Sequence, residues 1–464
     1  MRKTSIYALI LTLFVSILPV HAQENIDLPD RVCTKIVENT PDPSVSSIGG
    51  EWAVVALARS GYNMPDGYYD SYRQKAAEYI NEGNARRYTD YSRITLALSA
   101  LGYNAAAAVE YLNDFDKVVS QGINGAVYAL IALDSKEYNS DLRAKYLEFI
   151  LEKQHADGGF GLSDDSDIDV TAMTLQALAN YSDDENVQNV IRKALQYLDV
   201  QNIVTSESAS QAVIAMCAIG HSADKYEAEL MKYYKDGMFE HEIGGGENIM
   251  ATEQAACALA ALKRYKNGEK FIYDMTDTEQ KNGSTGFLDI SAGDAKHLEF
   301  LKANNVMGGR SESVFDPDNM ITRAEFASIA VRALQYKQNI EITDKNSFSD
   351  VPSDSWYKSY VATAAKYGLI YGMSESEFAP DENLTREMAM VIMTRICKAC
   401  GRNISVNDAD NILNSYDDKI SDWAKNETAF CVKNGYFKNN PIEPQKNITR
   451  VETARMLAEI LWDD

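Results

Sequence analysis

Three arginines recur in the C-terminal part of the chain at almost equal spacing. Arg323, Arg386 and Arg450 each follow a threonine and lie 63 and then 64 residues apart. The Thr-x-x-Glu pattern at the first and third is typical of a capping box, which places the arginine at the first helical position. A cation there opposes the helix dipole at a cost of a few tenths to about 1 kcal/mol. Repeating a locally unfavourable residue three times indicates a site, and a guanidinium fork suits a carboxylate. An ion pair between repeats is the alternative.

Other residues with suitable chemistry accompany these arginines. Trp356 and Trp423 offer a flat face to a sugar ring or else pack in a core. Near the start of each repeat lies an aspartate that accepts sugar hydroxyls or, as we slightly prefer, caps the following helix: Asp289, Asp350 and Asp418. The first repeat has His297 and Phe300 in place of a tryptophan. We therefore expect the second and third repeats, which carry both an arginine and a tryptophan, to bind more strongly than the first.

Metal and thiol chemistry find little support in the sequence. Cys397-Lys-Ala-Cys400 is a CxxC sequence, but a zinc site needs four ligands and Cys431 is the only obvious third. The stretch from Met390 to Cys400 also has the spacing of an amphipathic helix, which favours two buried thiols. No HExxH motif occurs. We expect no metal and no cofactor.

The elements that carry these residues are predicted to be helices throughout, so the fold class is all-α. Between residues 23 and 275, small-residue helical patterns close on similar pairs, from Ala56-Leu57 to Ala261-Leu262. The steps between successive pairs are 44, 32, 45, 41 and 43 residues. Periods of about 20–50 residues are typical of stacked supersecondary units. With a second helix between successive patterns, about six helix pairs close into a ring or form an open solenoid.

One stretch of this region resembles a known family. Gln154-His-Ala-Asp-Gly-Gly-Phe-Gly161, Asp169-Val-Thr-Ala172 and Leu175-Gln-Ala-Leu178 are similar to the prenyltransferase and squalene-cyclase repeat. The resemblance implies an α/α toroid of alternating inner and outer helices over about 250 residues. Toroid proteins that carry cobalamin also resemble this part, but they continue into a β-domain that the sequence here does not indicate.

The resemblance singles out Asp169 as a candidate catalytic acid. Class II terpene cyclases protonate an alkene through the middle aspartate of a D-x-D-D-T-A motif. Here the corresponding residues are Asp167-Ile-Asp169-Val170-Thr-Ala, so the last aspartate is lost. A strong carboxylic acid needs neighbours that hold its proton and stabilise the charge left behind. We favour a helix cap for Asp167 or Asp169, and a toroid that binds a ligand or partner rather than catalysing.

The C-terminal part resembles the S-layer homology module in three copies. Phe-x-Asp (Tyr416-Asp-Asp418 in the third copy), Gly, Pro and Thr-Arg landmarks recur in the same order over residues 286–342, 343–405 and 406–464. A polar, glycine-containing break at residues 276–285 is the predicted linker. The resemblance implies small helical modules in a pseudo-threefold bundle, whose grooves bind an anionic, often pyruvylated, secondary cell-wall polysaccharide.

The net charge of the chain and its N-terminal segment indicate which partners and which localisation to expect. Lys and Arg total 45 against 68 Asp and Glu, a net charge of −23, which argues against a nucleic-acid partner. Residues 1–22 have the three parts of a signal peptide, and no later apolar run is long enough to span a membrane. We therefore predict a secreted, wall-anchored surface protein that displays a toroid. A surface-anchored enzyme of the terpene-cyclase or prenyltransferase class and a cobalamin-like ligand carrier are the alternatives.

Overall fold

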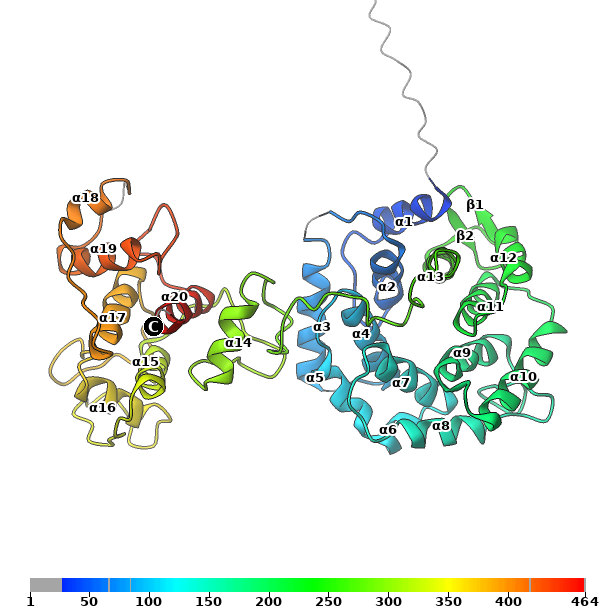
Figure 1. Cartoon of the computed structure of the whole chain (residues 1–464), viewed down its shortest axis with the longest axis horizontal. Helices are drawn as coiled ribbons and strands as arrows, with labels where there is room; N and C mark the ends of the chain where they lie inside the picture. Colours follow the sequence, from blue (N-terminus) through cyan, green and yellow to red (C-terminus); the bar gives the residue numbers. More distant parts are fainter. Residues whose placement is uncertain (1–26, 66, 84, 417–418, 463–464) are drawn as a thin grey trace, which may run out of the picture.

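The computed structural model describes residues 27–462 apart from 66, 84 and 417–418. The predicted signal peptide and Asp418 lie outside the described residues. The described chain is mainly helical, as the all-α prediction requires, with one small antiparallel sheet in the order β1 (Tyr234–Lys235), β2 (Met238–Glu240) and β3 (Glu247–Asn248). Two hydrophobic cores divide the chain into a ring body, up to about residue 286, and a bundle body after it. Figure 1 shows the two bodies side by side.

Six helices with many small residues form the inside of the ring body. They are α2 (Glu51–Ser60), α4 (Thr89–Ala100), α7 (Ile123–Ser135), α9 (Ile168–Leu178), α11 (Ser206–Ala218) and α13 (Ile249–Lys266). Each packs against the next, and α13 also packs against α2, so the contacts form a closed cycle (Figure 1). Alanine and serine allow this close approach, and most residues of these helices are buried.

Shorter or more amphipathic helices surround the inner six. They are α1 (Leu28–Asn39), α3 (Asp70–Glu82), α5 (Ala106–Val109), α6 (Phe115–Val119), α8 (Arg143–Leu151), α10 (Glu185–Asp199) and α12 (Asp224–Leu230), with 3-10 turns at Glu110–Asn113, Ala179–Tyr181 and Met231–Tyr233. Polar side chains fix where several helices begin. Asp167 caps α9, Asp184 caps α10, and Asn248 caps α13, each accepting a hydrogen bond from a first-turn amide.

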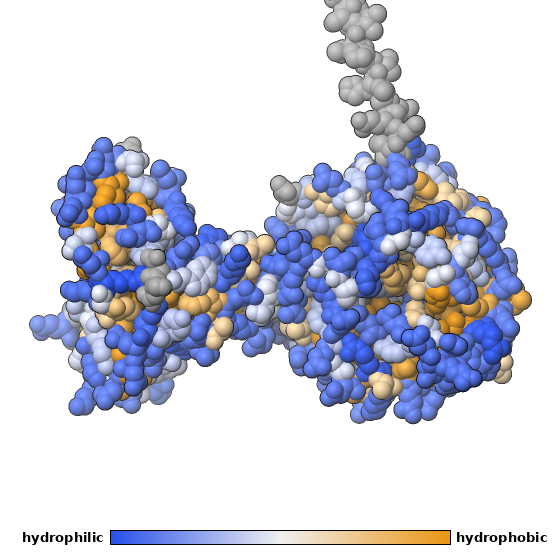
Figure 2. All heavy atoms as spheres, viewed as in Figure 1, coloured by the Kyte–Doolittle hydropathy of each residue, from blue (hydrophilic) through white to orange (hydrophobic). Residues whose placement is uncertain are grey.

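Aromatic side chains from separate segments of the ring body contact one another. The ring of Trp52 lies 5.9 Å from that of Tyr128 and 6.1 Å from that of Tyr273. Tyr273 belongs to the segment after α13, which crosses back over the ends of the inner helices. In Figure 2 the visible face is mostly hydrophilic, and apolar residues show towards the middle of the ring body.

That returning segment is docked against the ring body. The amide of Met275 donates to the carbonyl of Ser135 at 2.7 Å, and the amide of Lys281 donates to Gly102 at 2.7 Å. Asn282 is fully buried. Beyond the segment, Arg73 of α3 donates to the carbonyls of Leu288 and Ile290. Residues 276–285 therefore pack against the ring body and continue directly into the first C-terminal repeat.

Three long helices form the centre of the bundle body, and each begins at one of the recurring arginines. They are α15 (Arg323–Lys337), α17 (Arg386–Ala399) and α20 (Arg450–Trp462), and each contacts the other two. The shorter helices are α14 (Ala295–Ala303), α16 (Lys358–Lys366), α18 (Ala409–Leu413) and α19 (Lys425–Lys433), with a 3-10 turn at Asp422–Ala424. α16 packs on α15, α19 on α17, and α14 on α20. Each repeat thus packs on the long helix of the one before, and the first on the third.

The starts of the long helices connect the repeats to one another. The first amide of each long helix donates at 2.9 Å to a loop carbonyl of the next repeat in the cycle: Arg323 to Glu382, Arg386 to Lys446, and Arg450 to Asn319. Loop carbonyls therefore satisfy amides that a helix start leaves unpaired. The capping boxes predicted at Thr322/Glu325 and Thr449/Glu452 are present. In α17, Thr385 caps alone, as Met388 at the glutamate position predicts.

Candidate functional site

Two of the recurring arginines bind loop carbonyls of the neighbouring repeat. Arg323 donates from Nε to Phe378 and from Nη2 to Tyr371, both at 2.8 Å. Arg450 donates in the same way to Phe315 and Gly308, both at 3.0 Å. Their side chains are buried, and each guanidinium also lies over the phenylalanine ring whose carbonyl it binds. Burial lowers the pKa of both guanidinium groups. Among the described residues, neither Nη1 has a hydrogen-bond acceptor.

Arg386 is bound differently. It donates from Nη2 to Glu452 at 2.5 Å, from Nε to the other oxygen of Glu452 at 3.3 Å, and from Nη1 to Glu443 at 2.8 Å. A further bond from Nη1 reaches the carbonyl of Ile442. This is the ion pair between repeats that the sequence left open as the alternative. Every nitrogen of this guanidinium that carries hydrogen is engaged within the protein.

The recurring aspartates hold loops in place. Asp289 accepts hydrogen bonds from the amides of Phe315 and Asp316, and Asp350 accepts them from Phe378 and Ala379, at 2.6–3.1 Å. Burial raises the pKa of Asp289; in Asp350 it acts the same way, but the amide hydrogen bonds prevail and lower the pKa. The expected capping role was wrong for these two residues, because their partners are amides 26–29 residues away. Each instead fixes the loop whose carbonyl binds Arg450 or Arg323.

A groove between repeats brings a tryptophan and an arginine together. We call it the first groove. Its cavity of about 240 Å³ is lined by Met307, Gly308, Gly309, Arg310, Glu325, Ser328, Ile329, Arg332, Trp356 and Arg450. Trp356 is 59% exposed and Trp423 is 55% exposed, so neither is a core residue. Arg450 comes from the third repeat and Trp356 from the second. Pairing within one repeat, which the sequence analysis assumed, is therefore wrong, because the short helix of each repeat packs on the long helix of the one before.

A cavity of the same size lies beside the loop of the third repeat, and we call it the third groove. Its lining residues differ in charge and type from those of the first groove. It is lined by His297, Gly435, Tyr436, Phe437, Lys438, Asn439, Glu452, Arg455, Met456 and Glu459. It contains no tryptophan, and Arg386 is not part of its lining. Arg455 is held by Asp294 at 2.5 Å, and Lys438 lies 3.1 Å from Glu459. From the sequence we expected the first repeat to bind the polymer most weakly. Its loop instead lines the first groove, which contains both an arginine and a tryptophan.

Comparison with known proteins identifies the bundle body. A sequence profile of the S-layer homology domain matches residues 286–327 and 347–389. Residues 286–389 contain two S-layer homology domains. The third repeat, residues 406–464, lies outside the matched residues but continues the same helix pattern and closes the cycle with the two S-layer homology domains.

Relatives share part of the chain. An amylopullulanase of Thermoanaerobacterium thermosulfurigenes is 32% identical over 233 residues, 49% of this chain and 12% of that protein. A surface-layer 125 kDa protein of Lysinibacillus sphaericus is 29% identical over 174 residues, covering 36% and 14%. A cellulosome-anchoring protein of Acetivibrio thermocellus is 27% identical over 173 residues, 36% of each chain. The chain thus spans at most about a third of the length of these relatives. With the S-layer homology domains, they place the protein at the cell surface as a secreted protein.

Within the described part of the chain, no helix combines the length and apolar character needed to cross a bilayer.

Asp169 lies at the start of α9 beside other acidic side chains. Asp167, not Asp169, makes the cap, accepting from the amide of Val170 at 3.0 Å. Burial raises the pKa of Asp169, and the nearby charges of Asp167 and Glu207 add to this. Its Oδ1 has no hydrogen-bond partner among the described residues. Glu207 is paired with Nδ1 of His241 at 2.8 Å. A partly buried acid with a raised pKa is present, but buried Val170 stands where the terpene-cyclase motif has its last aspartate.

The cysteines lie mainly in the cores. Cys397 and Cys431 are buried in the bundle body, and burial raises the pKa of the Cys397 thiol to about 11. Cys400 is half-buried and, like the other described cysteines, is not in a disulfide. Among described residues, no three His, Cys, Asp or Glu side chains gather in a metal-binding arrangement.

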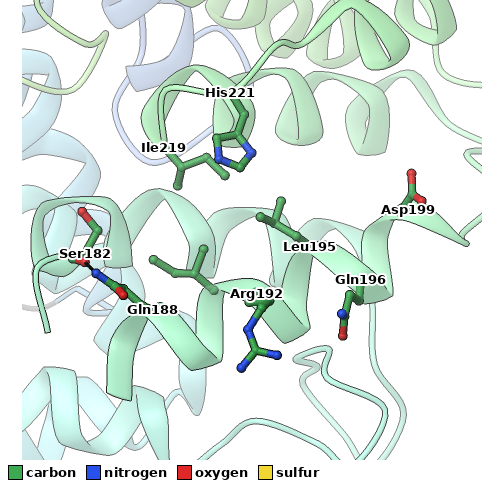
Figure 3. A pocket seen from close by; sticks show the side chains of 9 residues that line it. Ser182, Gln188, Arg192, Leu195, Gln196, Asp199, Ile219 and His221 are labelled. Atoms are coloured by element: carbon green, nitrogen blue, oxygen red, sulfur yellow. Dashed lines mark hydrogen bonds between the residues drawn. The ribbon is translucent and has the colours of Figure 1, made fainter. Parts of the chain in front are cut away.

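Other features were not singled out by sequence reasoning. Arg332 and Arg395 occupy equivalent places on α15 and α17, and their 63-residue step repeats that of Arg323 and Arg386, which was a usable signal. A surface hollow of about 590 Å³ lies along α10, where Ile191 and Leu195 meet Ile219 and His221 from the end of α11 (Figure 3). No sequence pattern predicts a surface hollow with this mixture of polar and apolar lining residues.

Proposed function

We propose that the protein is anchored non-covalently to the cell wall through the bundle body, which binds an anionic secondary wall polysaccharide, with a pyruvylated sugar as the charged unit. The observation that supports this most directly is the first groove. There Nη1 of Arg450 has no acceptor among the described residues, and the exposed Trp356 lines the same cavity. A charge-assisted hydrogen bond to a carboxylate contributes about 1.5–3 kcal/mol.

The groove supplies more than one cation for this purpose. Arg332 lines the same cavity as Arg450, and so does Arg310, which is paired there with Glu325. They act locally although the whole chain carries a net charge of −23. Salt screens the long-range repulsion of an anionic polymer over about 8–10 Å, whereas partly buried charges are screened much less. The acidic surface is therefore compatible with an anionic partner.

Replacing Trp356 by alanine is expected to weaken wall binding about tenfold and leave folding unchanged. The side chain is exposed, so its loss opens no core cavity, while the lost face-to-face contact with a sugar ring is worth about 1–2 kcal/mol. The measurement is co-sedimentation of the full chain with purified Gram-positive cell walls over a range of concentrations. Tyr265→Ala, an exposed aromatic residue of the ring body, is the matched control. Equal binding of Trp356→Ala and wild type, or wild-type binding undiminished by stripping the polymer, would show the proposal to be wrong.

We further propose that the ring body is an α/α toroid that the bundle body displays and that binds a ligand or partner without catalysing a reaction. The closed cycle of inner helices supports the toroid, and buried Val170 beside Asp169 argues against terpene cyclisation. Incubating wild type and Asp169→Asn with a linear polyprenyl substrate is expected to give no cyclised product with either. Product from the wild type alone would establish the enzyme alternative, because an amide cannot donate the required proton.

A further inference from the structure

The third helical position differs among the three long helices. It is Glu325 in α15, Met388 in α17 and Glu452 in α20. In both glutamate-bearing helices this side chain closes the capping box, accepting from the amide of Thr322 or Thr449 at 3.1 Å. Its carboxylate therefore sits at the helix start, beside the groove. In the third groove it also binds Arg386, the groove's recurring arginine.

Both carboxylate oxygens of Glu452 accept hydrogen bonds from Arg386. One oxygen accepts from Nη2 at 2.5 Å and the other from Nε at 3.3 Å, while Asn439 donates to Glu452 at 2.9 Å. Glu452 lines the third cavity and Arg386 does not. Glu452 on Nε and Nη2, with Glu443 and the carbonyl of Ile442 on Nη1, thus leaves no nitrogen of this guanidinium for an anionic ligand.

The first groove also has a glutamate at the third helical position, Glu325, but this side chain does not bind the recurring arginine, Arg450. Glu325 forms an ion pair with Arg310, a residue of the loop that lines this groove. Nε and Nη2 of Arg450 bind carbonyls, and Arg450 makes no hydrogen bond to Glu325 among the described residues. The third repeat has Asn440 where the first has Arg310, and the nearby Lys438 and Arg455 are paired with Glu459 and Asp294 instead of Glu452.

Arg323, Tyr371, Arg395 and Trp423 are the sequence equivalents of Arg450, Gly308, Arg332 and Trp356 in the first groove. We infer a second groove from this equivalence, and it has no glutamate at the third helical position. Met388 stands at the third helical position, and the loop residue equivalent to Arg310 is Met373. Arg323 binds two carbonyls and no carboxylate among the described residues. Arg395 lies 4.5 Å over the ring of Tyr371, whose carbonyl Arg323 binds.

We propose that a glutamate at the third helical position closes a groove to anions unless a loop cation holds it: the first groove, where Arg310 pairs with Glu325, and the second, which has Met388, bind the carboxylate of the wall polymer, and Glu452 closes the third. This rests on the proposed function of the bundle body. A ligand carboxylate in the third groove would have to displace Glu452 and leave a nearly buried charge without its partner, which is strongly unfavourable. The same residue that caps the helix thereby excludes the ligand.

Titration calorimetry of the full chain with the methyl glycoside of a pyruvylated hexose tests this, because a monosaccharide cannot bridge two grooves. Wild type is expected to bind two molecules. Glu452→Gln, which keeps the acceptor for Thr449, is expected to bind three, since the buried carboxylate on Arg386 is lost and only the half-exposed Glu443, on Nη1, still pairs with the guanidinium. Met388→Glu is expected to bind one, and Met388→Gln is its uncharged control with two. The same glycoside without the pyruvyl group measures the part that does not depend on charge.

The outcomes separate the two proposals. No binding of the pyruvylated glycoside by any variant, with full retention of wall binding, would show that the polymer's charged unit is wrong. Three sites in wild type, or two in folded Glu452→Gln, would overturn the role of the third helical position. If Met388→Glu fails to fold, Glu452→Gln alone decides, because it adds a site rather than removing one.

Discussion

Arg386→Ala is expected to destabilise the bundle body by about 3–5 kcal/mol, because the substitution leaves Glu452 nearly buried without its cation. Arg386 joins the second repeat to the third, so its loss also separates α17 from the loop before α20. Thermal and urea unfolding of the full chain, followed by circular dichroism, measure the effect. A cation at a helix start opposes the helix dipole and so does not stabilise its own helix, but all three arginine side chains are buried between repeats.

A double variant identifies the cause. Arg386→Ala with Glu452→Gln is expected to recover much of the loss, since the amide carries no charge to leave unpaired. Arg323→Ala is expected to cost less than Arg386→Ala, because its partners are neutral carbonyls. If the double variant is no more stable than Arg386→Ala, the lost packing of the side chain, and not the unpaired charge, determines the stability.

Glu253→Gln is expected to stabilise the ring body at pH 8 by up to about 3 kcal/mol and to have little effect near pH 4. Burial raises the pKa of Glu253 to about 7, the amide of Gly49 opposes the shift, and the charge of Glu51 adds to it. The folded state therefore holds a proton that the unfolded state releases above about pH 4.5, so this residue's contribution to stability falls as pH rises to about 7. Glutamine stays neutral and keeps an acceptor for Gly49, whose amide lies 2.8 Å from Oε1.

The difference in unfolding free energy between variant and wild type, measured from pH 4 to pH 8, checks this prediction. Glu247→Gln, an exposed residue just before the same helix, is the control and is expected to show no such trend. A difference for Glu253→Gln that is constant across this range would mean that the carboxyl titrates normally in the folded protein.

Sequence patterns predicted what depends on interactions within one element or one repeat. Thr322 with Glu325 predicted a capping box, and Met388 predicted its loss in α17, because these bonds join residues three positions apart. The helical spacing from Met390 to Cys400 predicted two buried thiols; this is right for Cys397 and wrong for Cys400, which is half-buried near the end of α17. Repeating small-residue patterns likewise predicted a mainly helical chain, although whether the helices close into a ring was left open.

Only the tertiary structure decided which repeats meet. Trp356 shares a groove with Arg450, far away in the sequence, because each short helix packs on the long helix of the preceding repeat. Asp289 and Asp350 bind amides of their own repeats instead of helix starts, because the loop that follows the short helix returns to them. Arg386 and Glu452 carry opposite charges in any arrangement, but only the cyclic packing of the repeats brings them to 2.5 Å. Local sequence determines which residue begins a helix. Which residue its side chain binds depends on how all the repeats pack together, and that packing is determined by the hydrophobic core as a whole.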